Sequence, residues 1–106
     1  MSKDIIEKLF KVIETRKDAD PKKSYVASLY AKGTKKIAQK VGEEAVEVAI
    51  EAARDKKKLV KEESADLLLH LMVLWSQMGL KPKDILGVLE DRFGQGGLDE
   101  KAGRKK

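Results

Sequence analysis

The segment from about Leu59 to Met78 constrains the fold more than any other part of the chain, because it is apolar around nearly its whole helical circumference. Such a helix must be buried on almost every side. A single domain of 106 residues buries only a modest core, so we expect a second copy of the chain to cover part of this helix. Its narrow polar strip consists of Glu63, Asp66, His70 and Gln77.

The rest of the chain also shows helical spacing, and no stretch alternates apolar and polar residues with the period of a strand. Serine, threonine, proline and glycine at the expected boundaries mark helix starts and stops. The sequence therefore predicts an all-α bundle. Its helices run from about Lys3 to Lys17, from a Ser24 cap through Lys32, from a Thr34 cap to about Arg54, from about Leu59 to Met78, and from Pro82 through about Phe93.

A short linker around Lys56 joins the two long helices, so they should form an antiparallel hairpin. The shorter helices should flank this hairpin. We assign residues 1–93 to one domain and residues 94–106, which are rich in glycine and lysine, to a flexible C-terminal tail.

The first long helix carries an acidic strip that lies between two apolar sectors. Lys40, Glu44, Glu47 and Glu51 share an arc of roughly 60° on a helical wheel. Buried carboxylates are costly to desolvate and persist mainly beside cations or metal ions. The predicted hairpin places Glu47 opposite the turn that holds Glu63 and Asp66.

Four carboxylates, those of Glu44, Glu47, Glu63 and Asp66, should therefore converge and hold one or two divalent ions. Each helix contributes its pair at i, i+3 spacing, which places both side chains on one face. Because the chain has no cysteine, an all-carboxylate site favours Mg²⁺, or Mn²⁺, over zinc. The alternative is a set of surface salt bridges from the glutamates to Lys40 and Arg54. The acidic pair on an almost wholly apolar partner helix favours the metal site.

The acidic residues resemble a known signature. EEAVE at residues 43–47 and ESAD at residues 63–66 look like the EExxE and ExxD motifs of the all-α NTP pyrophosphatase superfamily. The sequence around them at 30–52 and 65–75, and RFGQGGLDEKA at 92–102, is similar to the phosphoribosyl-ATP pyrophosphatase family in particular. The resemblance covers nearly the whole chain, without a departure in the acidic motif.

This resemblance implies Mg²⁺-dependent hydrolysis of 1-(5-phosphoribosyl)-ATP to the AMP derivative and pyrophosphate, the second step of histidine biosynthesis. It also implies a homodimer in which two hairpins complete a four-helix core. The alternative is a related pyrophosphatase that acts on (d)NTPs. The metal ligands that the resemblance implies are Glu44, Glu47, Glu63 and Asp66. Of the catalytic residues Glu43, Glu44 and Glu47, Glu43 would support the ligands or orient the attacking water.

Several other residues are candidates for substrate contacts. Lys40 and Lys36 could bind phosphates, although ordinary helix solubility explains each of them about as well. Tyr25 would line the substrate entrance by resemblance. His70, the only histidine, could be a general acid, but a hydrogen-bonded histidine behind the ligands or in the core is favoured.

Charge and apolar patterning restrict the other classes of protein. The net charge of +5 suits an anionic partner and equally serves solubility. No recognition motif supports nucleic-acid binding, so we expect no nucleic-acid partner. The chain has neither a membrane-length apolar stretch nor a signal peptide, which predicts no membrane contact and a cytoplasmic location. A di-iron bundle would need a glutamate three residues before His70, where this chain has Leu67.

Overall fold

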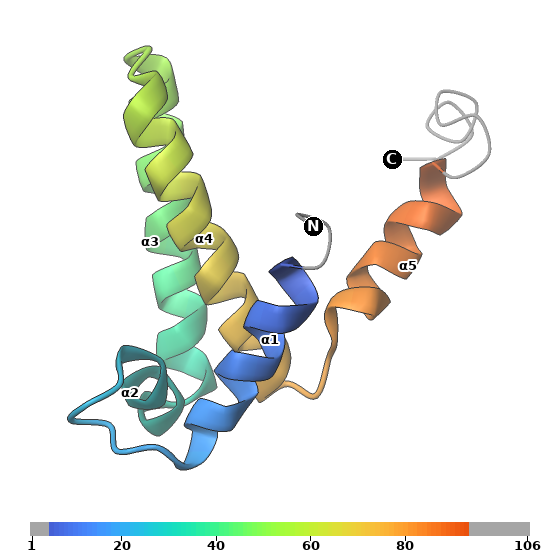
Figure 1. The fold of residues 1–106 in the computed structure, drawn as a ribbon. Helices are drawn as coiled ribbons and strands as arrows, with labels where there is room; N and C mark the ends of the chain where they lie inside the picture. The colour runs from blue at the N-terminus through green and yellow to red at the C-terminus, as the bar shows by residue number, and fades with distance from the viewer. Residues whose placement is uncertain (1–4, 94–106) are drawn as a thin grey trace.

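The computed structural model describes residues 5–93, and within this range it contains helices and no strand (Figure 1). The all-α prediction is confirmed. The predicted tail 94–106 lies outside the described residues, so the division of the chain stays a prediction. The elements are α1 (Ile5–Thr15), the 3-10 turn η2 (Arg16–Asp18), α2 (Tyr25–Lys32), α3 (Thr34–Ala53), α4 (Lys57–Gln77) and α5 (Pro82–Phe93).

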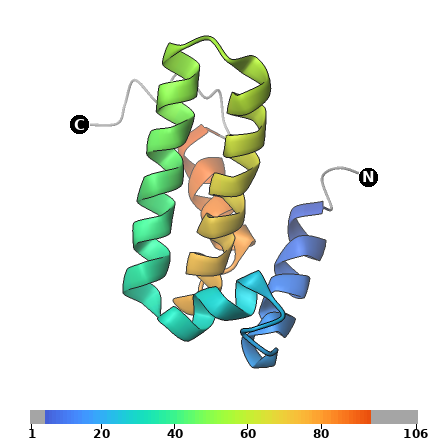
Figure 2. The same cartoon turned by 90° about the vertical axis from the view of Figure 1, so that its left-hand side faces the viewer.

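The two long helices, α3 and α4, form the predicted antiparallel hairpin (Figure 2). Their connection is tight: the Asp55 amide donates to the Ala52 carbonyl oxygen at 3.0 Å, and the Lys56 amide to that of Glu51 at 3.0 Å. Asp55 takes φ 58, the left-handed conformation that aspartate tolerates better than most residues. Helix α4 begins at Lys57, slightly earlier than predicted.

The start of α3 differs from the prediction. Thr34 is not its cap but its first helical residue, and Gly33 holds the N-cap position with φ 91 and ψ 171. The Gly33 amide donates to the carbonyl oxygens of Leu29 and Tyr30, and its own carbonyl accepts from Ile37. One glycine therefore ends α2 and starts α3, in a conformation that L side chains rarely adopt. The predicted Ser24 cap of α2 is confirmed, because its side chain accepts from the Ala27 amide.

The core lies at the end of the hairpin away from its turn, where α1 and α2 pack against α3 and α4. Helices α1, α2, α3 and α4 meet there around one apolar cluster. Hydrogen bonds also join them: the Tyr30 hydroxyl donates to Ser76 Oγ at 2.6 Å, and Ser76 Oγ donates to Glu14 Oε2 at 3.2 Å. The buried cluster consists of Phe10, Ile13, Leu29, Ile37, Met72 and Val73.

A single chain leaves much of its apolar surface uncovered. Leu68, in the helix that the sequence predicts to be buried on almost every side, is 38% exposed. Helix α5 makes its main contacts with α1 and extends away from the hairpin (Figure 1), with Leu86, Val88 and Leu89 exposed. None of the helices within residues 5–93 combines the length and the apolar character needed to cross a membrane.

Candidate metal centre

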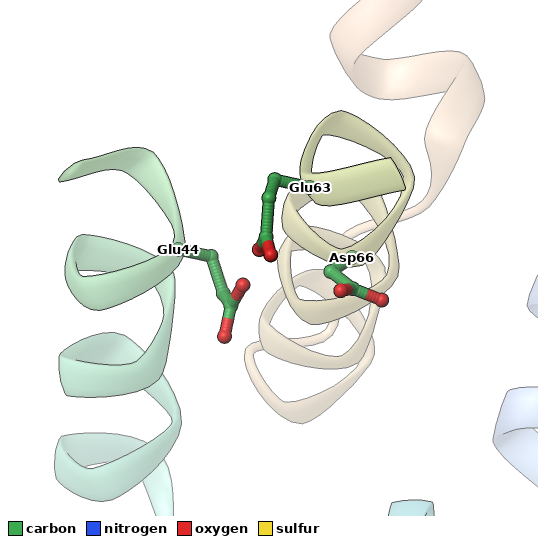
Figure 3. Close-up of side chains that lie close together, drawn as sticks. All are labelled: Glu44, Glu63 and Asp66. Atoms are coloured by element: carbon green, nitrogen blue, oxygen red, sulfur yellow. The ribbon is translucent and has the colours of Figure 1, made fainter. Parts of the chain in front are cut away.

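Three of the predicted carboxylates meet between the two long helices. Glu44 extends from α3, and Glu63 and Asp66 extend from α4 (Figure 3). Each offers a carboxylate oxygen, and these oxygens all lie within 4.8 Å of one another. The i, i+3 spacing brings Glu63 and Asp66 to one face of α4, and the short turn of the hairpin sets Glu44 opposite them.

No ion pair within residues 5–93 balances the negative charge of these three carboxylates. None of the three forms an ion pair with a lysine, arginine or histidine of the described part of the chain. A hydrogen bond with the Glu44 carboxyl group raises the pKa of Glu63, and desolvation and then the negative charges of Glu44, Asp66 and Glu47 raise it further. A cluster of oxygen donors with excess negative charge fits a hard divalent cation such as Mg²⁺ or Mn²⁺.

The raised pKa of Glu63 predicts a pH-dependent gain in stability for Glu63→Gln in the presence of chelator. A carboxyl group whose pKa is raised on folding stabilises the fold below its unfolded pKa, and this contribution is lost as the pH rises through its folded pKa. Glutamine keeps the volume and lacks the charge. The melting temperature of the variant, relative to the parent, should therefore rise as the pH increases above the unfolded pKa of glutamate, about 4.3.

Thermal melts in chelator at a series of pH values above this pKa test the prediction. The matched control is Glu62→Gln, which removes an exposed carboxylate whose Oε2 pairs with Lys58 Nζ at 3.3 Å. The control should melt like the parent or slightly lower, because exposed ion pairs contribute little. A Glu63→Gln variant that is less stable than the parent at pH 7 would mean that Glu63 takes part in a stabilising salt bridge.

Glu47 and Glu51 continue the acidic strip toward the hairpin turn. Glu47 is exposed and lies outside the set of three, although its charge contributes to the raised pKa of Glu63. Its role as a fourth ligand stays a prediction. Glu51 Oε1 is buried, accepts no hydrogen bond from the described residues and lies 3.8 Å from Arg54 Nη1. The salt-bridge alternative thus applies to Glu51 and not to the three clustered carboxylates.

Glu43 lies on the flank of α3 beside the cluster and has its own partners. It accepts a hydrogen bond from Gln39 Nε2 at 2.9 Å and pairs with Lys40 Nζ at 3.4 Å. The hydrogen bond from Gln39 and then that from Lys40 lower the pKa of Glu43. Lys36 Nζ donates to Gln39 Oε1 at 3.5 Å. An open groove of about 510 Å³ beside them is lined by Gln39, Gly42, Glu43, Val46 and Glu47.

Tyr25 and His70 form a contact that the sequence did not predict. The Tyr25 hydroxyl lies 2.7 Å from His70 Nε2, and His70 Nδ1 lies 2.7 Å from the Asp66 carbonyl oxygen. His70 is only 4% exposed, which supports the hydrogen-bonded core histidine over the general acid. Because 45 positions separate the two residues, only the docking of α2 onto α4 brings them together, and no local pattern could have indicated the pair.

Comparison with known proteins gives consistent matches over nearly the whole described region. A family model described as phosphoribosyl-ATP pyrophosphohydrolase matches residues 6–93. A phosphoribosyl-ATP pyrophosphatase from Azospirillum brasilense is 52% identical over 95% of this chain and 91% of its own length. A protein of the same name from Rhodospirillum rubrum is 50% identical over 97% of this chain and 88% of its own length. Another, from Paramagnetospirillum magneticum, is 49% identical over 96% of this chain and 94% of its own length.

Proposed function

Because the chain belongs to the phosphoribosyl-ATP pyrophosphohydrolase family, we propose that it hydrolyses 1-(5-phosphoribosyl)-ATP to 1-(5-phosphoribosyl)-AMP and pyrophosphate at a divalent-ion site between α3 and α4. This reaction is a step of histidine biosynthesis. The observation that supports the site most strongly is the convergence of Glu44, Glu63 and Asp66, none of which forms an ion pair with another described residue.

The proposed ligands of Mg²⁺, or of Mn²⁺, are Glu44, Glu63 and Asp66, with Glu47 joining them. A bound ion of this kind supplies neutralisation of the charge that develops on the departing pyrophosphate. Glu44 and Glu63 come from different helices, so the rigid hairpin fixes the direction of the ligand oxygens. Reorientation of the exposed Glu47 side chain, one helical turn after Glu44, would bring its carboxylate to the same ion.

Glu43 is proposed to orient the attacking water rather than to remove its proton. Its pKa is lowered by Gln39 and Lys40, so the carboxylate is ionised at neutral pH and accepts hydrogen bonds, but it is a weak base. Lys36 and Lys40 are proposed phosphate contacts on the same helix. Either lysine would have to exchange its present partner, Gln39 or Glu43, for a phosphate oxygen.

A substrate panel tests the proposed reaction. Pyrophosphate release is measured with phosphoribosyl-ATP, ATP and the dNTPs, each with Mg²⁺. We expect phosphoribosyl-ATP to be hydrolysed with the highest kcat/KM. Faster hydrolysis of a dNTP would favour the related (d)NTP pyrophosphatases, and release from none of the substrates would contradict a pyrophosphohydrolase. A cytoplasmic location, which we infer from the nucleotide substrate, is checked by cell fractionation.

We further propose that the protein is a homodimer in which a second hairpin completes a four-helix core. The support is the apolar surface that one chain leaves exposed, including Leu68 on α4 and Val46 and Ile50 on α3. Burial of these side chains against a second copy of the chain would remove apolar surface from water. Light scattering at micromolar concentration should give twice the mass of one chain. A stable and active monomer would contradict the proposal.

A further inference from the structure

Both ring nitrogens of His70 are engaged at the point where α2 meets the acidic strip of α4. Its Nδ1 lies 2.7 Å from the Asp66 carbonyl oxygen, which can only accept, so Nδ1 carries a proton. In the neutral ring Nε2 is therefore an acceptor, and the Tyr25 hydroxyl donates to it at 2.7 Å. A buried imidazole thus fixes the direction of one tyrosine.

Tyr25 itself is poorly suited to a core role. It is the first residue of α2 and is 52% exposed, so it buries little apolar area. Its ring meets the His70 ring edge to face, with centroids 5.7 Å apart and an interplanar angle of 78°. The Tyr25 side chain is thus held by His70 and is still about half exposed, as expected of a side chain that presents a surface to a ligand.

Lys40, on α3, interacts electrostatically with Tyr25. The Tyr25 oxygen, whose ionised form attracts the ammonium group, is the largest cause that raises the pKa of Lys40, and Glu43 adds to it. The hydrogen bond to His70, one helical turn after Asp66, places the Tyr25 hydroxyl beside the acidic strip of α4. From this position the hydroxyl and the ring can contact a nucleotide whose phosphates face the metal centre.

We infer that His70 is a positioning residue that holds the Tyr25 side chain beside the metal centre as one wall of the nucleotide site. The inference rests on the proposed function, because it assigns the ligand of Tyr25 to the nucleotide substrate. His70 acts only through Tyr25 and needs no change of protonation. Loss of the hydrogen bond should weaken nucleotide binding and leave the chemical step nearly unchanged.

Two substitutions of His70 separate its two hydrogen bonds. In His70→Gln the amide reaches as far as Nε2 and can still accept from Tyr25. In His70→Asn it reaches only as far as Nδ1, so the bond to the Asp66 carbonyl is kept and the bond to Tyr25 is lost. The matched control is Tyr30→Phe, which removes another tyrosine hydroxyl, bonded to Ser76 Oγ at 2.6 Å, in the scaffold behind the site.

The experiment measures the Kd of phosphoribosyl-ATP by calorimetry with Ca²⁺ in place of Mg²⁺, and kcat and KM with Mg²⁺. We expect Tyr25→Phe and His70→Asn to raise Kd and KM by about 3- to 10-fold, which is the loss of affinity that corresponds to one net hydrogen bond. The kcat of both variants should stay within about threefold of the parent value. His70→Gln and Tyr30→Phe should keep the Kd of the parent. The double variant Tyr25→Phe/His70→Asn should bind no more weakly than either single variant.

The outcomes separate this inference from the proposed function. If Tyr25→Phe binds the nucleotide as tightly as the parent, the positioning inference is overturned, and this half-exposed position decides the case even if the His70 variants do not fold. If the parent binds phosphoribosyl-ATP without hydrolysing it while Tyr25→Phe binds it more weakly, the proposed reaction fails and the positioning role stands. A parent that does not bind the nucleotide overturns both.

Discussion

Glu44→Gln is expected to lower kcat/KM for phosphoribosyl-ATP by about 100-fold or more, a loss of roughly 3 kcal/mol of transition-state stabilisation. Glu44 is the one member of the convergent set that α3 supplies. Glutamine keeps its volume and removes the charge that a divalent ion requires. The effect should therefore arise from weaker ion binding and not from a change of fold.

Steady-state pyrophosphate release and thermal melts of the same preparations test this prediction. Glu62→Gln is again the control, since it removes a carboxylate from the exposed side of α4 and should retain nearly full activity. In chelator Glu44→Gln should melt at the temperature of the parent or above. The raised pKa of Glu63 arises first from its hydrogen bond with Glu44, which the glutamine oxygen can still accept, and then from desolvation and from charge repulsion, part of which the variant relieves. An inactive variant that melts well below the parent would assign Glu44 to the scaffold.

Removal of the divalent ion is expected to have the largest effect of all. Excess chelator should reduce hydrolysis to the background rate, and added Mg²⁺ or Mn²⁺ should restore it. Glu44, Glu63 and Asp66 are the one group of at least three histidine or acidic side chains among the described residues that is clustered closely enough to hold an ion. Full activity in excess chelator would exclude the proposed chemistry.

The same ion should stabilise the fold. A ligand that binds only the folded state adds about 1.4 kcal/mol to the free energy of unfolding at ten times its Kd, which raises the melting temperature of a domain of this size by roughly 5 °C. The parent should show this gain with Mg²⁺. Glu44→Gln should show much less of it, and an equal gain would place the ion elsewhere.

Local rules predicted most of the fold. Helical periodicity, the Ser24 cap and the glycines after the helices gave the number and order of the α-helices. The errors lie at the ends: the first helix passes into a 3-10 turn after Thr15, and Gly33 replaces Thr34 as the cap. These ends depend on backbone conformations, such as φ 91 at Gly33, that residue type alone does not determine.

The metal centre was predictable only in part. Spacing of i, i+3 and a short turn were enough to predict that carboxylates of the two long helices meet. They placed Glu47 opposite Glu63 and Asp66, whereas the set that meets in the structure contains Glu44. They could not determine whether Glu47 points into the cluster, because that depends on its rotamer and on the exact rotation of α3 against α4. The bond between Tyr25 and His70 depends on tertiary docking of α2, which leaves no periodic signal in the sequence.

The central claim, that Glu44, Glu63 and Asp66 form a divalent-ion site, is tested most directly by equilibrium Mn²⁺ binding. The electron paramagnetic resonance signal of free Mn²⁺ weakens as the ion binds, so it reports binding without substrate or turnover. The parent should bind Mn²⁺ with a Kd below about 1 mM, Glu62→Gln should match it, and Glu44→Gln and Asp66→Asn should bind about 10-fold or more weakly. Binding by Glu44→Gln and Asp66→Asn as tight as that of the parent would contradict the account.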